Sequence, residues 1–205
     1  MPIAAQLHAK QPLVLASASP RRKDLLQQLG LEFVVQVADV DESVLPQEQP
    51  AAHVQRLAEA KARAVQPLHP QSVVLAGDTV VVLNGAILGK PKDKTHAQQM
   101  LEQLSGNTHT VFSGYCLTDG KTGHTILRVE TTQVHFHPLP QDWLHFYLNT
   151  EEGMDKAGAY AIQGLGAVMI RGIEGAYHNV VGFPVERIAW DLLEAGWVGM
   201  GPLPQ

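Results

Sequence analysis

The sequence lacks the features that mark secreted and membrane-bound proteins. It has one cysteine, Cys116, among 205 residues, so no disulfide can form within the chain and we expect a reducing compartment. No run of about 18 apolar residues occurs, and the opening MPIAAQLHAK lacks the charged start and long apolar core of a signal peptide. We therefore expect a cytoplasmic protein with no membrane partner.

Positive charge is also scarce. The 15 lysines and arginines are outnumbered by 20 acidic residues, the formal net charge is −5, and the basic residues are scattered apart from the Arg21–Arg22 pair. This balance argues against a nucleic-acid partner.

Neither a Walker A sequence nor a Gly-x-Ser-x-Gly elbow occurs, and Gly164-Leu-Gly166 lacks the third glycine of a dinucleotide fingerprint.

The apolar pattern predicts a mixed α/β protein with a largely antiparallel centre, folded as one domain over residues 1–205. The Asn84-Gly85 pair between two apolar runs predicts a hairpin turn. The predicted helices cover residues 20–29, 51–65, 94–104, 140–149 and 185–195, and the predicted strands cover 13–17, 32–38, 72–78, the two arms of 107–137 and 167–173.

The start of the first predicted helix is the most informative segment. Ser19 is expected to be its N-cap, and Pro20 suits the first helical position because its missing N–H costs nothing there. Arg21 and Arg22 then fall in the first turn, where the helix dipole disfavours each cation by about 0.3–1 kcal/mol. Together with the hydroxyl of Ser17, these groups could bind a phosphate. The alternative is a capped surface helix with two solvated arginines.

Several other charged residues could act on the same anion. Asp78 follows a Val-Val-Leu run and is predicted at the end of a strand, where it could bind a metal ion, take a proton from water or simply cap a turn. Lys61 lies on the apolar stripe of its helix and could instead extend along the core edge to solvent, and Lys90 follows a hairpin. Asp41 and Glu42 are candidates for holding Mg²⁺, or are solvated loop residues.

Gln163 lies in the glycine-rich stretch 155–166. Its amide offers both a donor and an acceptor, which can match the edge of a nucleobase. The alternative is a flexible loop with an incidental amide.

Taken together, these segments resemble the Maf family of nucleoside triphosphate pyrophosphatases. The likeness runs in unbroken order from about residue 13 to about residue 195. The matching segments are Ser17–Arg22, Val40–Glu42, Glu59–Ala62, Gly77–Val81, Gly89–Pro91, Leu104–Gly106, Asp155–Gly164 and Asn179–Pro184.

The resemblance implies an elongated, Maf/ITPase-like mixed sheet with flanking helices, arranged as two lobes around a deep cleft and often dimeric. It implies hydrolysis of a nucleoside triphosphate to the monophosphate and pyrophosphate with Mg²⁺ or Mn²⁺. Asp78 matches the proton acceptor, and Arg21, Thr79 and Gln163 match the residues of the branch that acts on dTTP and UTP. The phosphate-binding candidates are Ser17, Ser19, Arg21, Arg22, Lys61 and Lys90, and the metal candidates are Glu42 and Asp78.

Two departures from the family pattern are small. Phe183 stands where leucine is common, and about ten residues are added at the N-terminus; we expect neither to touch a proposed site residue. Three alternatives stay open: the family branch that acts on 7-methyl-GTP, a nucleotide-binding regulator of cell division with slow turnover, and a protein-interaction domain.

Overall fold

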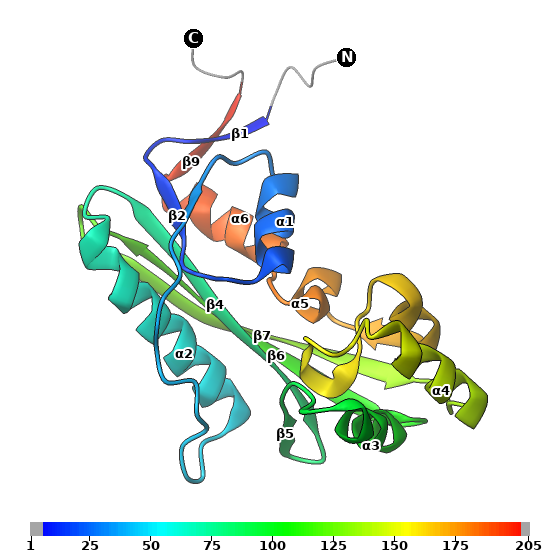
Figure 1. Cartoon of the computed structure of the whole chain (residues 1–205). Helices are drawn as coiled ribbons and strands as arrows, with labels where there is room; N and C mark the ends of the chain where they lie inside the picture. The colour runs from blue at the N-terminus through cyan, green and yellow to red at the C-terminus, as the bar shows by residue number, and fades with distance from the viewer. Residues whose placement is uncertain (1–5, 202–205) are drawn as a thin grey trace. The chain divides into compact units, whose positions relative to one another are not determined.

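The computed structural model describes residues 6–201 as a mixed α/β protein (Figure 1). The first five residues, part of the segment expected not to be a signal peptide, lie outside the described residues. In chain order, with η marking 3-10 helices, the elements are β1 (Gln6–Ala9), β2 (Leu13–Leu15), α1 (Pro20–Gln28), β3 (Val34–Val35), α2 (Pro50–Val65), η1 (Gln66–Leu68), β4 (Val73–Leu83), β5 (Ala86–Leu88), α3 (Lys94–Leu104), β6 (Thr108–Asp119), β7 (Thr125–Phe136), α4 (Gln141–Thr150), η2 (Ala157–Ala159), η3 (Gly164–Met169), β8 (Ile170–Glu174), α5 (Tyr177–Val181), α6 (Val185–Glu194) and β9 (Val198–Gly201).

Most strands form one mixed sheet. Its order is β3-β2-β4-β6-β7-β8, with β5 paired to β4 outside this path. β2 runs parallel to β3 and β4, whereas β5 and β8 run antiparallel to their partners. β1 and β9 form a separate two-stranded antiparallel pair, which Figure 1 shows in blue and red. The expected mixed sheet with flanking helices is confirmed.

The chain divides into two compact units. Unit 1 comprises residues 1–78, 113–129 and 182–205, and unit 2 comprises residues 79–112 and 130–181. The long strands β4, β6 and β7 contribute residues to both units. The single domain expected over residues 1–205 stays a prediction.

In unit 1, both faces of β2 and of the first half of β4 are buried. Val14 and Val74 on one face pack against Ala58 and Ala62 of α2. The alternate residues, such as Leu15, are equally buried, so the opposite face is covered as well. Figure 1 shows α1 and α6 on the side of the strands away from α2. Such two-sided burial explains the nearly continuous apolar run in the strands.

Unit 2 has a core of its own. Its residues come from the second half of β4, from α3 and α4, and from the arms of β6 and β7 that belong to this unit. The aromatic rings of Phe136 and Tyr160 meet edge to face there, with centroids 4.9 Å apart. Within the described residues, no helix is both long enough and apolar enough to cross a membrane.

The predicted helices are confirmed to within two residues at either end, and Asn84 and Gly85 form the predicted hairpin turn between β4 and β5. The prediction that Asp78 ends a strand is wrong, because β4 continues from Val73 to Leu83 and Asp78 lies inside it. Gly77 keeps the chain extended rather than turning it, and the apolar run after Thr79 prolongs the strand. Of the strand predicted at 32–38, only Val34–Val35 forms. The strand predicted at 167–173 forms as β8 from Ile170 onward, whereas residues 167–169 end the 3-10 helix η3.

Candidate functional site

The first turn of α1 is built as predicted, with one difference. Ser19 is the N-cap and Pro20 opens the helix, but the Ser19 hydroxyl accepts no capping hydrogen bond. Ser17 Oγ instead accepts a bond of 3.2 Å from the Ser19 amide. Ser17 is buried and Arg21 is half-buried. The segment therefore places a serine hydroxyl and helix amides near a basic pair, as phosphate binding would require.

Arg22 is a buried residue that holds neighbouring backbone in unit 1. Its Nη1 donates to Gly77 O at 2.7 Å and to Ser17 Oγ at 3.3 Å, and its Nε donates to Gly182 O at 3.0 Å. Burial lowers the pKa of Arg22, and the nearby charge of Asp78 opposes that shift. Arg22 thus fixes the residue that precedes Asp78. The solvated-arginine alternative is wrong for this residue.

Phe183 touches a proposed site residue, contrary to expectation. Its ring centroid lies 5.9 Å from the guanidinium carbon of Arg22, within the range of a cation–π contact. A Cβ atom added to Gly77 would lie 2.9 Å from the Phe183 ring and 3.1 Å from Gly114 O. The absence of a side chain at Gly77 therefore lets the ring pack directly on β4 beside Arg22.

Lys61 joins two of the predicted acidic residues. Its Nζ lies 2.8 Å from Asp78 Oδ1 and 2.6 Å from Glu42 Oε1. The Lys61 side chain is only 7% exposed, so it ends among these carboxylates and does not extend to solvent. A buried ammonium requires such partners, because an uncompensated charge in the interior is costly. The structure therefore brings together Lys61, Glu42 and Asp78.

The two carboxylates have the chemistry of a partial magnesium site. Glu42 Oε1 and Asp78 Oδ1 both contact Lys61 Nζ, at 2.6 Å and 2.8 Å, so these two carboxylate oxygens lie close together. Mg²⁺ typically takes one or two carboxylates and completes its shell with waters and substrate phosphates. Asp41 is used differently, because its Oδ1 accepts from the Ser43 amide at 2.9 Å. In the described residues, no group of three or more His, Cys, Asp or Glu residues could hold a metal ion.

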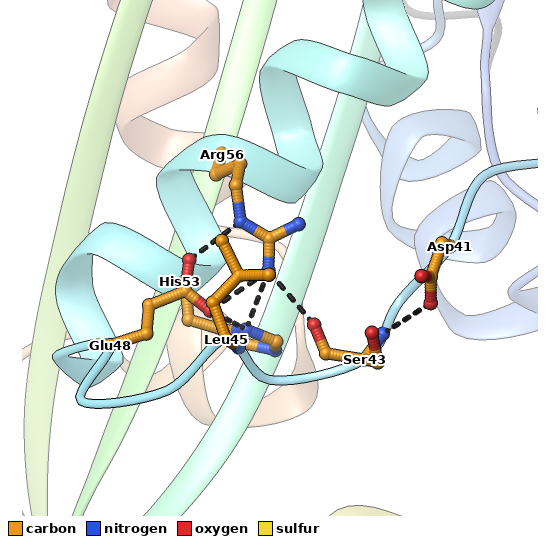
Figure 2. A network of polar contacts seen from close by, with 6 residues as sticks. All are labelled: Asp41, Ser43, Leu45, Glu48, His53 and Arg56. Atoms are coloured by element: carbon orange, nitrogen blue, oxygen red, sulfur yellow. Dashed lines mark hydrogen bonds and ion pairs between the residues drawn. The ribbon is translucent and has the colours of Figure 1, made fainter.

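The loop that carries Glu42 is anchored to α2 by Glu48 (Figure 2). The Glu48 carboxylate accepts from Arg56 Nε at 2.6 Å, from Arg56 Nη2 at 2.8 Å and from the Leu45 amide at 3.0 Å. His53 Nδ1 lies 2.9 Å from it, and Arg56 Nη2 also donates to Ser43 O at 3.0 Å. The hydrogen bonds from Arg56 are the main reason why the pKa of Glu48 is well below its usual value.

Sequence reasoning missed this anchor. Glu48 precedes α2 and Arg56 lies two turns inside it, so no helical spacing connects them. Glu48 stands between Gln47 and Gln49, so nothing in the local sequence indicates that its side chain is only 7% exposed. We call Glu48, His53 and Arg56 the acidic-loop anchor.

The remaining predicted residues belong to unit 2. Thr79 follows Asp78 in β4, and Lys90 is exposed just after β5. The Gly158 amide donates to Gly89 O at 3.1 Å, which ties the turn of Lys90 to the glycine-rich stretch. Gln163 is exposed at the N-cap of η3. Lys90 and Gln163 thus lie on segments that unit 2 positions through backbone contacts.

The two arginines of α1 should differ in their effect on stability. Arg22→Met would leave the carbonyls of Gly77 and Gly182 without their donor, at about 1–3 kcal/mol for each buried group. Arg21→Met should change the free energy of unfolding by no more than about 0.5 kcal/mol, since the residue is half-buried and the helix dipole disfavours it. Denaturant unfolding of both variants checks this. Equal effects would contradict the role of Arg22.

Loss of the acidic-loop anchor should free the loop without unfolding the protein. Glu48→Gln removes the charge that binds Arg56, so the Leu45 amide should exchange with deuterium about tenfold faster or more. Glu59→Gln is the matched control, because Glu59 pairs with Arg63 on the outside of the same helix. Exchange at Leu45 that is equal in both variants would show that Glu48 does not hold the loop.

Comparisons with known proteins identify the family of this chain. Residues 12–195 match the family model described as Maf-like protein. A dTTP/UTP pyrophosphatase of Desulforamulus reducens is 46% identical over 179 residues, covering 87% of this chain and 94% of the relative. Proteins of the same name from Moorella thermoacetica (48% over 176 residues; 86% and 91%) and Myxococcus xanthus (47% over 192 residues; 94% and 94%) are similar to it as well. The chain belongs to the Maf family.

Proposed function

We propose that this protein hydrolyses dTTP and UTP, each to the monophosphate and pyrophosphate. The observation that carries the proposal is membership of the Maf family over residues 12–195, together with the name dTTP/UTP pyrophosphatase borne by relatives that are nearly half identical. The carboxylate and ammonium groups that meet in unit 1 support the same chemistry.

The proposed reaction begins with water attacking the α-phosphorus. A new bond forms between the water oxygen and phosphorus, the bond from phosphorus to the bridging oxygen breaks, and pyrophosphate leaves with the bonding electrons. Asp78 takes the proton of the attacking water. Lys61 holds the Asp78 carboxylate at 2.8 Å, and Arg22 holds the preceding carbonyl, so the base is positioned before substrate binds.

The divalent cation is proposed to bind Glu42 and Asp78. Mg²⁺ or Mn²⁺ there would neutralise phosphate charge as the leaving group departs. Glu42 has a side chain that is 61% exposed and could change partner, whereas Asp78 is 13% exposed and held in β4. We therefore expect Asp78 to stay in place while Glu42 adjusts.

The proposed substrate contacts follow the chemistry of each side chain. Cations and hydroxyls bind phosphate oxygens, for which we propose Ser17, Ser19, Arg21, Arg22, Lys61 and Lys90. Arg21 and Thr79 are proposed to contribute to substrate choice. Gln163 would accept from N3–H and donate to O4 of uracil or thymine. We further propose a cytoplasmic homodimer.

A panel of triphosphates tests the proposal. With Mg²⁺ or Mn²⁺, pyrophosphate release should have the highest kcat/KM on dTTP and UTP, exceeding purine triphosphates by about tenfold or more, because a site built on hydrogen bonds rejects mismatched bases. Higher activity on 7-methyl-GTP would favour the other branch of the family. Binding of nucleotides without steady release of pyrophosphate would favour a regulator and contradict the proposal.

A further inference from the structure

The short segment that carries Gln163 is held on both sides by two side chains of unit 2. Before Gln163, the Ala161 amide donates to the Tyr147 hydroxyl at 3.2 Å. After it, the Leu165 and Gly166 amides donate to the two carboxylate oxygens of Glu152, at 3.0 Å and 2.9 Å. Gln163 therefore lies between two fixed points of the backbone.

Tyr147 and Glu152 also bind each other. The Tyr147 hydroxyl donates to Glu152 Oε1 at 3.2 Å, so one oxygen links both fixed points. Tyr147 lies in α4 and is 1% exposed. Burial, followed by the charge of Glu152, raises the pKa of Tyr147, so its hydroxyl keeps the proton that it donates.

Gly164 and Gly166 let the backbone of this segment approach Tyr147 and Glu152 closely. Gly164 has a φ of +69°, and a Cβ atom there would lie 2.5 Å from Glu152 Oε2. A Cβ atom on Gly166 would lie 3.0 Å from the Tyr147 hydroxyl. Side chains at either position would push the pair away, so the contact depends on backbone that approaches closely. Glu152 also supports the start of the 3-10 helix η3 over residues 164–169, because it accepts hydrogen bonds from two of the first N–H groups of that helix.

Gln163 itself has no such support. Its side chain is exposed and makes no hydrogen bond with the residues that the structure describes. The backbone on either side therefore sets the position and direction from which the Gln163 side chain extends.

We propose that Tyr147 and Glu152 are positioning residues that orient Gln163 toward the pyrimidine base and so set the preference for dTTP and UTP. The inference rests on the proposed function. The pair touches neither phosphate nor metal in this account, so loosening it should weaken base recognition and leave the chemical step largely intact. We therefore expect the loss to appear as a lower ratio of kcat/KM for pyrimidine over purine triphosphates.

The test compares Glu152→Gln and Tyr147→Phe with a neighbouring control. Glu151→Gln is the control, because Glu151 is exposed and pairs with Lys94 on the surface of unit 2. The ratio of kcat/KM for UTP over GTP is measured on one sample of each variant, so the folded fraction cancels. Hydrogen exchange at Ala161, Leu165 and Gly166 reports on the backbone independently of activity.

Glu152→Gln should lower the UTP-to-GTP ratio by about tenfold, as loss of a charged hydrogen-bond acceptor would, and Gln163→Ala should lower it similarly. Amide exchange should rise at Leu165 or Gly166 in Glu152→Gln and at Ala161 in Tyr147→Phe, and Glu151→Gln should match the wild type. A UTP-to-GTP ratio that is unchanged in both Glu152→Gln and Tyr147→Phe would overturn the inference. If the wild type fails to release pyrophosphate from dTTP and UTP, the proposed function fails instead.

Discussion

The ammonium group of Lys61 is the constraint on which the site of unit 1 depends. It is almost fully buried, and the described residues that it contacts are the carboxylates of Glu42 and Asp78. Removing one partner would lower the free energy of unfolding, but the second carboxylate would still compensate the buried charge. The contact therefore ties the acidic loop and β4 to α2. In the proposed reaction, the same contact holds the general base before substrate arrives.

Two carboxylates outside the set of proposed catalytic and binding residues, those of Glu48 and Glu152, hold segments that carry members of that set. Glu48 fixes the loop that brings Glu42 to Lys61, through Arg56 and the Leu45 amide. Glu152 fixes the segment that carries Gln163. In both cases an acidic side chain that is not fully exposed accepts from backbone N–H groups of a neighbouring segment, the loop after Glu42 or the first turn of η3, and so fixes the shape of that segment. Exposed functional side chains can then remain adaptable while their backbone is rigid.

The sequence predicts those parts of the structure that have local causes. Apolar periodicity locates the helices, and the order Ser19-Pro20 locates the start of α1, because caps and proline act within a few residues. The site residues Lys61, Asp78 and Glu42 were recognisable by their residue types, and the structure brings these three together. Their roles are inferred from chemistry and from the family resemblance.

Other features have causes that are distant in sequence. Nothing near Arg22 indicates that its guanidinium binds the carbonyl of Gly182, which is 160 residues away. The sequence predicts Asp78 at a strand end because a Val-Val-Leu run gives way to polar residues there, whereas β4 continues and Gly77 admits the ring of Phe183. Glu48 and Glu152 are missed for a different reason: their partners lie 3 to 14 residues away, but no regular helix or strand spacing connects them.

Replacement of Asp78 tests the account most directly. Asp78→Asn keeps the size of the side chain but can neither take a proton from water nor balance Lys61 as a carboxylate does. The account predicts a folded protein whose release of pyrophosphate from UTP falls by about 10²-fold or more, as expected for a lost general base. Asp41→Asn should stay near wild type, because Asp41 Oδ1 accepts from the Ser43 amide and an asparagine oxygen can do the same. Turnover of Asp78→Asn within about threefold of wild type would contradict the account, since general-base catalysis contributes far more than that.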